Sequence, residues 1–62
     1  MKETLYQRIR DILLRIEGKI IILQRNIKDY KKENDFENAM KCDIKKTTFE
    51  MIAKDLEKEL NT

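Results

Sequence analysis

Apolar residues return at every third or fourth position through the first half of this chain, and that spacing constrains the fold more than any other feature. The gaps of 4, 3, 4, 4, 3, 4 and 3 connect Leu5, Ile9, Ile12, Ile16, Ile20, Leu23, Ile27 and Tyr30. Such a period places one apolar stripe along an α-helix of about seven turns. The sequence has no proline and one glycine, so almost nothing interrupts it. We predict a first helix over about 3–31.

A polar run separates this stripe from a second apolar segment. Residues 31–35 read Lys-Lys-Glu-Asn-Asp, with two cations suited to a helix C-terminus and then two residues suited to an N-cap. Asn34 followed three residues later by Glu37 approximates a capping box. We predict a turn over about 32–35 and a second helix over about 36–60. The alternative is one continuous helix, because lysine and glutamate both favour helices.

Folding the two segments back on each other gives one domain of the all-α class, an antiparallel two-helix hairpin that resembles a coiled coil. Residues on one side of the second segment match the first stripe in length. The predicted hairpin core is Ile9, Ile16, Ile20, Leu23, Ile27, Tyr30, Phe36, Met40, Ile44 and Met51. Two helices touch only along a line, and a chain of 62 residues buries little surface without further support.

Apolar residues remain after this core is assigned. Residues 20–23 are four consecutive aliphatic residues that point in four directions, and Leu14 and Ile21 lie away from the core with Gly18 between them. We predict a second contact surface in which Leu14, Gly18, Ile21 and Ile22 meet Phe49, Ile52 and Leu56 of another copy. Each fully buried side chain contributes roughly 1.5–3 kcal/mol. We therefore expect a homodimeric or higher helical bundle; the alternative is a hairpin with a few exposed aliphatic residues.

The sequence carries none of the usual catalytic groupings. It has no histidine, no glycine-rich phosphate loop and one cysteine, Cys42, which is best interpreted as a small apolar filler. Its carboxylates are spread among lysines, so we expect no enzyme, no cofactor and no metal site. The longest apolar run has four residues, far short of the roughly 20 that span a membrane. A lone cysteine fits a reducing compartment, and we expect a cytoplasmic protein.

Charge is distributed unevenly along the chain. Residues 1–32 carry nine Lys and Arg against four Asp and Glu, whereas residues 33–62 carry five against eight. A basic side of the first helix, formed by Arg8, Arg15, Lys19, Arg25 and Lys28, suggests nucleic-acid binding as an alternative function. Acidic residues interrupt that side and no aromatic platform accompanies it. Candidate contacts to a protein partner are Tyr6, Arg10, Arg15 and Lys19.

Residues 35–39 read Asp-Phe-Glu-Asn-Ala and enter a helix directly after another helix. This stretch resembles the UVR motif, a short antiparallel hairpin of bacterial excision-repair proteins and some protease adaptors. The likeness covers about Ile27 to Ile44, with departures at Met40, Cys42 and Asp43. It implies a hairpin that binds another protein.

The chain also resembles, in size and composition, the very small helical proteins with which phages block host enzymes or defence systems. It is rich in lysine, isoleucine and asparagine. From the sequence we expect a non-enzymatic protein-binding module, a small oligomeric inhibitor or adaptor.

Overall fold

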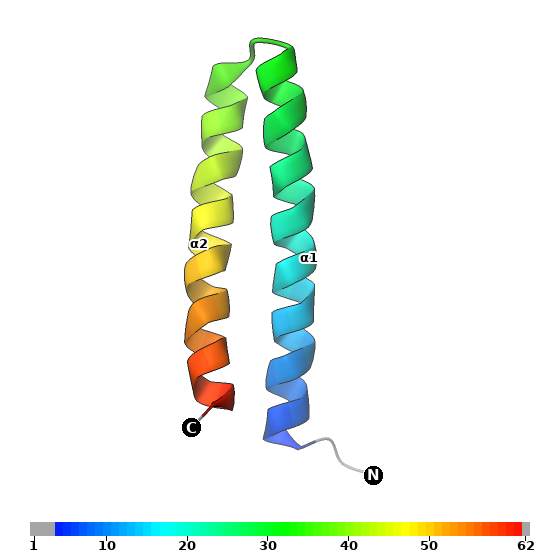
Figure 1. Cartoon of the computed structure of the whole chain (residues 1–62), viewed down its shortest axis with the longest axis vertical. Coiled ribbons are helices and arrows are strands. Elements are labelled where there is room, and N and C mark those ends of the chain that lie inside the picture. Colours follow the sequence, from blue (N-terminus) through cyan, green and yellow to red (C-terminus); the bar gives the residue numbers. More distant parts are fainter. Residues whose placement is uncertain (1–3, 62) are drawn as a thin grey trace.

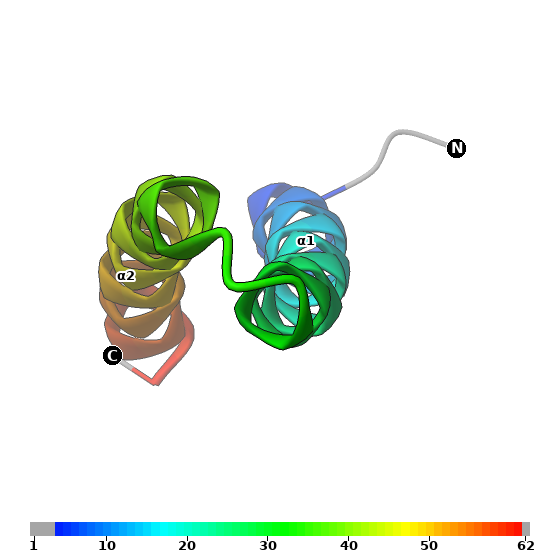
Figure 2. The same cartoon turned by 90° about the horizontal axis from the view of Figure 1, so that it is seen from above.

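The chain forms the predicted helical hairpin. The computed structural model describes residues 4–61 as two antiparallel helices, α1 (Leu5–Lys32) and α2 (Phe36–Leu60), joined by a three-residue turn (Figure 1). The helices lie side by side in two perpendicular views (Figure 2), and the hairpin measures 49 × 22 × 12 Å along its principal axes. The predicted start of the first helix, at about residue 3, lies outside the described residues. The second helix has the bounds expected from the sequence.

The start of α1 is fixed by a capping box. The backbone N–H of Gln7 donates to the Thr4 hydroxyl at 3.1 Å, and the Thr4 N–H donates to the Gln7 side-chain oxygen at 3.0 Å. These two bonds satisfy backbone donors that the first helical turn otherwise leaves without partners. Thr4 is therefore the N-cap, and the helix begins at Leu5.

α1 ends in a Schellman motif. Asn34 adopts a positive φ of 59°, the left-handed conformation that asparagine tolerates better than most residues. Its N–H donates to the Lys31 carbonyl at 3.1 Å, and the Asp35 N–H donates to the Tyr30 carbonyl at 2.8 Å. This pair of bonds satisfies carbonyls at the helix end and reverses the chain within three residues.

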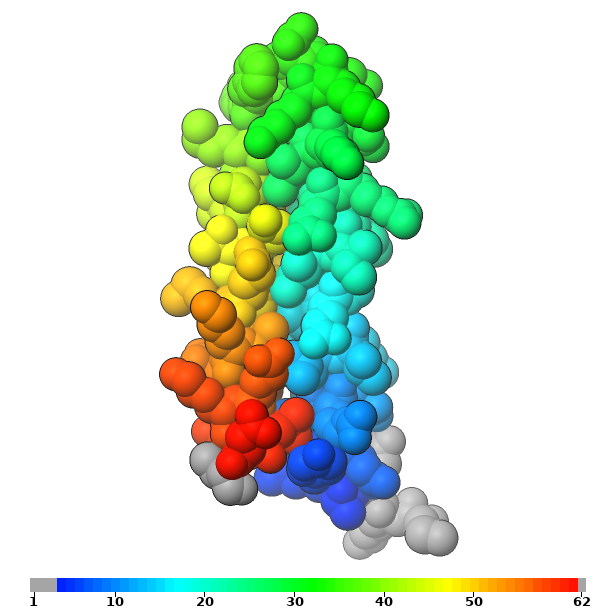
Figure 3. Space-filling model, in the orientation of Figure 1, coloured from blue at the N-terminus to red at the C-terminus, as the bar shows by residue number. Residues whose placement is uncertain are grey.

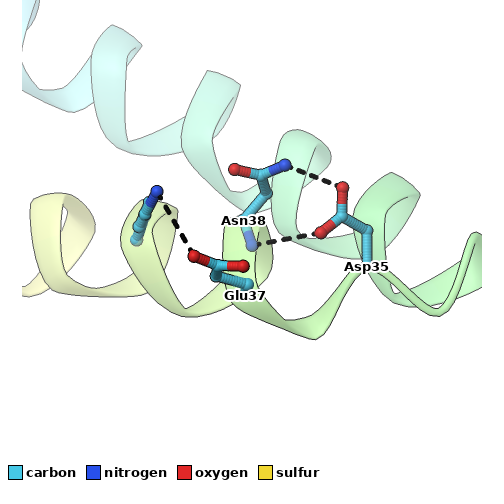
Figure 4. A network of polar contacts seen from close by, with 4 residues as sticks. Asp35, Glu37 and Asn38 are labelled. Carbon is cyan, nitrogen blue, oxygen red and sulfur yellow. Dashed lines mark hydrogen bonds and ion pairs between the residues drawn. The ribbon is translucent and has the colours of Figure 1, made fainter.

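Asp35 begins α2 immediately after the turn. Its carboxylate accepts the Asn38 backbone N–H at 3.3 Å and the Asn38 side-chain N–H at 2.7 Å, while Glu37 pairs with Lys41 one turn further on at 3.7 Å (Figure 4). The predicted capping box between Asn34 and Glu37 is therefore wrong. Asn34 is the left-handed residue that ends α1, so the N-cap of α2 is the next residue, Asp35.

The left-handed residue at the turn gives a test of this geometry. We expect Asn34→Ala to lower the free energy of unfolding by about 1 kcal/mol, because alanine lacks the side-chain amide whose local hydrogen bonding lets asparagine adopt a positive φ. Asn34→Gly should stay within about 0.5 kcal/mol of the wild type, since glycine adopts this conformation freely. Urea unfolding followed by far-UV circular dichroism measures both. Equal stability of the two variants would contradict the Schellman turn.

Side chains fill the line of contact between the helices along its whole length (Figure 3). Among residues 4–61, three are buried: Ile16 from α1, and Ala39 and Ala53 from α2. The half-buried apolar residues beside them are Ile9, Leu13, Ile20, Leu23, Ile27 and Tyr30 on α1, and Cys42, Phe49, Leu56 and Leu60 on α2. The α2 side of the contact thus combines two small buried residues, Ala39 and Ala53, which allow the backbones to approach, with larger half-buried ones such as Phe49.

Candidate functional site

The most exposed apolar surface of α2 lies on the side that faces away from α1. We call it the α2 stripe, and its members are Phe36, Met40, Ile44 and Met51. Each exposes between 61% and 65% of its surface. At 100° per residue, the stripe lies about 125° around the helix from the direction of the two buried residues of α2, Ala39 and Ala53. Four large apolar side chains in one row are more than the scattered exposure of ordinary surfaces.

This position corrects the prediction for α2. Phe36, Met40, Ile44 and Met51 were expected in the hairpin core, and all four are exposed. The side chains that face α1 instead belong to the opposite side of α2, around Ala39 and Ala53. Small residues allow closer helix packing than a row of phenylalanine and methionine would, and the short turn fixes how α2 is rotated as it leaves Asp35.

The same rotation corrects part of the predicted surface between copies. Phe49 and Leu56 were expected to face outward, but both are half-buried against α1. The Lys19 ammonium lies 5.5 Å from the centroid of the Phe49 ring, which ties that ring to α1. Ile52 is 40% exposed, at the edge of the hairpin.

Carboxylates flank the α2 stripe. Glu37, Asp43 and Glu50 all lie on α2 within one turn of a stripe residue and are exposed. Glu37 pairs with Lys41, and Glu50 pairs with Lys46 at 3.9 Å. The Lys46 side chain is the more covered partner of that pair, and its position beside the line of helix contact was not foreseen from the sequence.

An open hollow lies beside the turn end of the stripe. Phe36, Ala39, Met40 and Asp43 line it from α2, and Ile27 and Lys31 line it from α1. Its wall is therefore apolar, with one carboxylate and one ammonium at the rim. A large apolar side chain from another molecule would fit this environment.

A second exposed apolar surface lies on the outer side of α1. We call it the α1 patch, formed by Leu14, Gly18, Ile21 and Ile22; its three aliphatic residues are 54% to 62% exposed. Apart from its own helical turn, nothing in the hairpin lies within 4 Å of a β-carbon built on Gly18. The glycine is therefore not required by contact between α1 and α2. All four residues were predicted to lie away from the hairpin core, and the structure places them there.

The residues predicted to contact a partner are not brought together. The Arg10 guanidinium lies over the Tyr6 ring, 5.9 Å from its centroid, on one flank of α1. Arg15 follows Arg10 by five residues and points about 140° away, and Lys19 is engaged with Phe49. Tyr6 and Arg10 thus form a local pair beside Leu14, where a shallow hollow includes all three.

The basic residues of α1 also divide between two sides. Lys19 and Lys28 are nine residues apart and point in about opposite directions, while Arg8 and Arg15 share the side of Lys19. A phosphate backbone following one side of α1 would meet only part of the set. The cations therefore do not form the single stripe that the sequence suggested.

The described residues 4–61 contain no group of three His, Cys, Asp or Glu side chains placed to hold a metal ion. Cys42 is a half-buried free thiol on α2. Over the same range, neither helix combines the length and apolar character needed to cross a membrane. No protein-family model matches the chain, and neither a curated protein nor a solved structure is significantly similar to it. The likeness to the UVR motif therefore remains a hypothesis.

Proposed function

We propose that this chain is a non-enzymatic protein-binding module, an inhibitor or adaptor that engages a helix of its partner through the α2 stripe. One observation carries this proposal: four large apolar side chains stand in a row on α2, pointing away from α1. Their spacing of four, four and seven residues presents one continuous ridge to another helix. Two of the four are methionines, whose flexible side chains adapt to different apolar surfaces.

The charges beside the stripe indicate the chemistry of that helix. Asp43 flanks the apolar row without a lysine partner among residues 4–61, whereas Glu37 and Glu50 are paired with lysines of α2. The matching surface is therefore an amphipathic helix with apolar residues in its centre and a basic residue facing Asp43. Burying the row supplies affinity, and the flanking charges favour one orientation. The proposal also includes self-association through the α1 patch. The two contacts are compatible, because the α1 patch and the α2 stripe lie on different sides of the hairpin.

The test compares two double variants of α2. Met40→Gln with Ile44→Gln places two amides in the stripe, whereas Lys45→Gln with Thr48→Gln places the same amides at nearby exposed positions outside it. All four positions are exposed, so both variants should stay within about 1 kcal/mol of wild-type stability. We expect the stripe variant to lose at least about tenfold in affinity for a partner, and the control less than about threefold.

A photo-crosslinking residue at position 44, introduced in cells that make the protein, identifies the partner used in this comparison. A crosslinked protein that is lost with the stripe variant and kept with the control supports the proposal. A partner that binds both variants equally would contradict the stripe as the binding surface.

A further inference from the structure

Two of the three aliphatic residues of the α1 patch are placed symmetrically about Gly18, and the position that mirrors the third, Ile21, is Arg15. Leu14 lies four residues before the glycine and Ile22 four residues after it, and Ile21 lies beside Ile22 on the same outer side. More than half of each of these side chains is exposed. A surface that is symmetric about its own centre is suited to pairing with an identical, oppositely directed surface.

Charged residues continue the symmetry beyond the apolar centre. Asp11 lies seven residues before Gly18 and Arg25 seven residues after it, so both point within about 20° of the glycine's own direction. Both are exposed, and neither makes an ion pair with another residue of the described range 4–61. Opposite charges therefore stand unpaired at equal distances on the two sides of the patch.

Gly18 itself indicates a close approach from outside the hairpin. It lies in the interior of a 28-residue helix, where alanine would be more favourable. The open space around a built β-carbon shows that α2 does not require the glycine. A helix from another molecule that crosses at this point would approach the α1 backbone more closely than any side chain allows.

We propose that two copies pair α1 against α1, antiparallel, about a two-fold axis that passes near Gly18. In this arrangement, the numbers of two residues that face each other across the interface sum to 36. Leu14 meets Ile22 of the second copy, and Asp11 meets Arg25 of the second copy; the symmetry repeats both contacts. The inference rests on the self-association proposed above and specifies its surface and direction.

The α2 stripe is a poorer surface for symmetric pairing. Antiparallel pairing that places Phe36 opposite Met51 brings only like charges together, Glu37 with Glu50 and Lys41 with Lys46. The α1 pairing also places one like-charged pair opposite each other, Arg8 and Lys28, but it adds the opposite charges of Asp11 and Arg25. A contact between the α1 patch of one copy and the α2 stripe of the next would be head-to-tail and would extend without closing. Pairing through α1 leaves both stripes facing outward, so the dimer would present two partner-binding surfaces.

Sedimentation equilibrium of the full chain measures the association. We expect a reversible change from 7.5 kDa to twice that mass as concentration rises, with a dissociation constant on the order of 10–100 µM for so small an interface. A mass that stays at 7.5 kDa up to 500 µM would overturn both self-association and this inference. A mass that rises beyond two copies and falls in the Met40→Gln and Ile44→Gln variant would support the head-to-tail contact instead.

Exchanging the charges at positions 11 and 25 tests the antiparallel α1 pairing separately from self-association by any other surface. Asp11→Arg alone and Arg25→Asp alone each place like charges opposite one another twice, and we expect each to weaken its own dimer about five- to tenfold. Mixing the two variants restores opposite charges at both contacts, so a one-to-one heterodimer of about wild-type affinity should form. If the dissociation constants of the single variants and of their mixture all equal that of the wild type, the antiparallel α1 pairing is overturned while self-association stands.

Gly18→Ala is expected to raise the stability of the monomer and to lower the affinity of the dimer. At 1 µM, where the chain is monomeric, the melting temperature should rise because alanine favours the helix and meets no atom of the hairpin. The dimer should weaken about fivefold or more, because the added methyl groups stand where the two backbones approach. A dimer that is unchanged or tighter in this variant would overturn the close approach at Gly18.

Discussion

Replacing Phe49 with alanine is expected to unfold most of the hairpin, whereas replacing Phe36 with alanine is expected to leave it folded. Phe49 packs against α1 and lies beneath the Lys19 ammonium, while Phe36 is 61% exposed. A phenylalanine in a protein interior costs about 3–5 kcal/mol when truncated, and half-burial places Phe49 near the lower limit. A domain of this length has a total stability of roughly 3–9 kcal/mol, so that loss removes much of it.

The pair is informative because the chemical change is the same at both positions. Far-UV circular dichroism during thermal unfolding, at a concentration where the chain is monomeric, gives the two stabilities. We expect Phe36→Ala to cost less than about 1 kcal/mol, since most of its ring is already in water. Lys19→Gln removes the ammonium above Phe49 and should cost less than about 1 kcal/mol as well. If Phe36→Ala were the more damaging variant, α2 would face α1 with its other side.

The sequence was sufficient to predict α1 because only one of its sides carries a continuous apolar period. The α1 residues predicted for the hairpin core are all buried or half-buried: Ile9, Ile16, Ile20, Leu23, Ile27 and Tyr30. Leu5 and Ile12, which belong to the same apolar period, are exposed. The turn was also predictable, since a polar run of cations followed by Asn and Asp is typical of one helix ending and another beginning.

The orientation of α2 was not predictable in the same way. That helix carries two apolar sides, and the prediction chose the side with the larger residues, Phe36, Met40, Ile44 and Met51. The structure uses the side that contains Ala39 and Ala53. Periodicity gives the width and direction of each apolar side of α2. Which side packs against α1 depends on how closely the backbones approach and on how the turn rotates α2.

The turn therefore carries information that the apolar pattern lacks. The left-handed Asn34 and the bond from Asp35 to the Tyr30 carbonyl fix where α2 begins relative to the end of α1. Asp35 then caps its own helix, which leaves Phe36 as the first helical residue, pointing outward. The candidate binding surface follows from this rotation, because the residues expected inside the hairpin became the exposed stripe.

Ala53→Asp is expected to have the largest effect of any single substitution considered for this chain. Ala53 is 7% exposed and lies where α2 meets the aliphatic side of α1. A carboxylate there would lose much of its hydration. An unpaired charge buried in this way costs more than about 3 kcal/mol, and the helices would also be forced apart. We expect little helical signal at 25 °C.

Two matched variants separate the charge from other effects of the Ala53 change. Thr48→Asp adds the same carboxylate at an exposed position of α2 and should cost less than about 1 kcal/mol. Ala53→Ser adds one oxygen that can bond to the carbonyl one turn earlier, and we expect it to stay folded with a loss of about 1–2 kcal/mol. Helical content and urea unfolding measure all three. If Ala53→Asp and Thr48→Asp were equally folded, Ala53 would not lie at the contact between the helices, and the outward orientation of the α2 stripe would have to be abandoned with it.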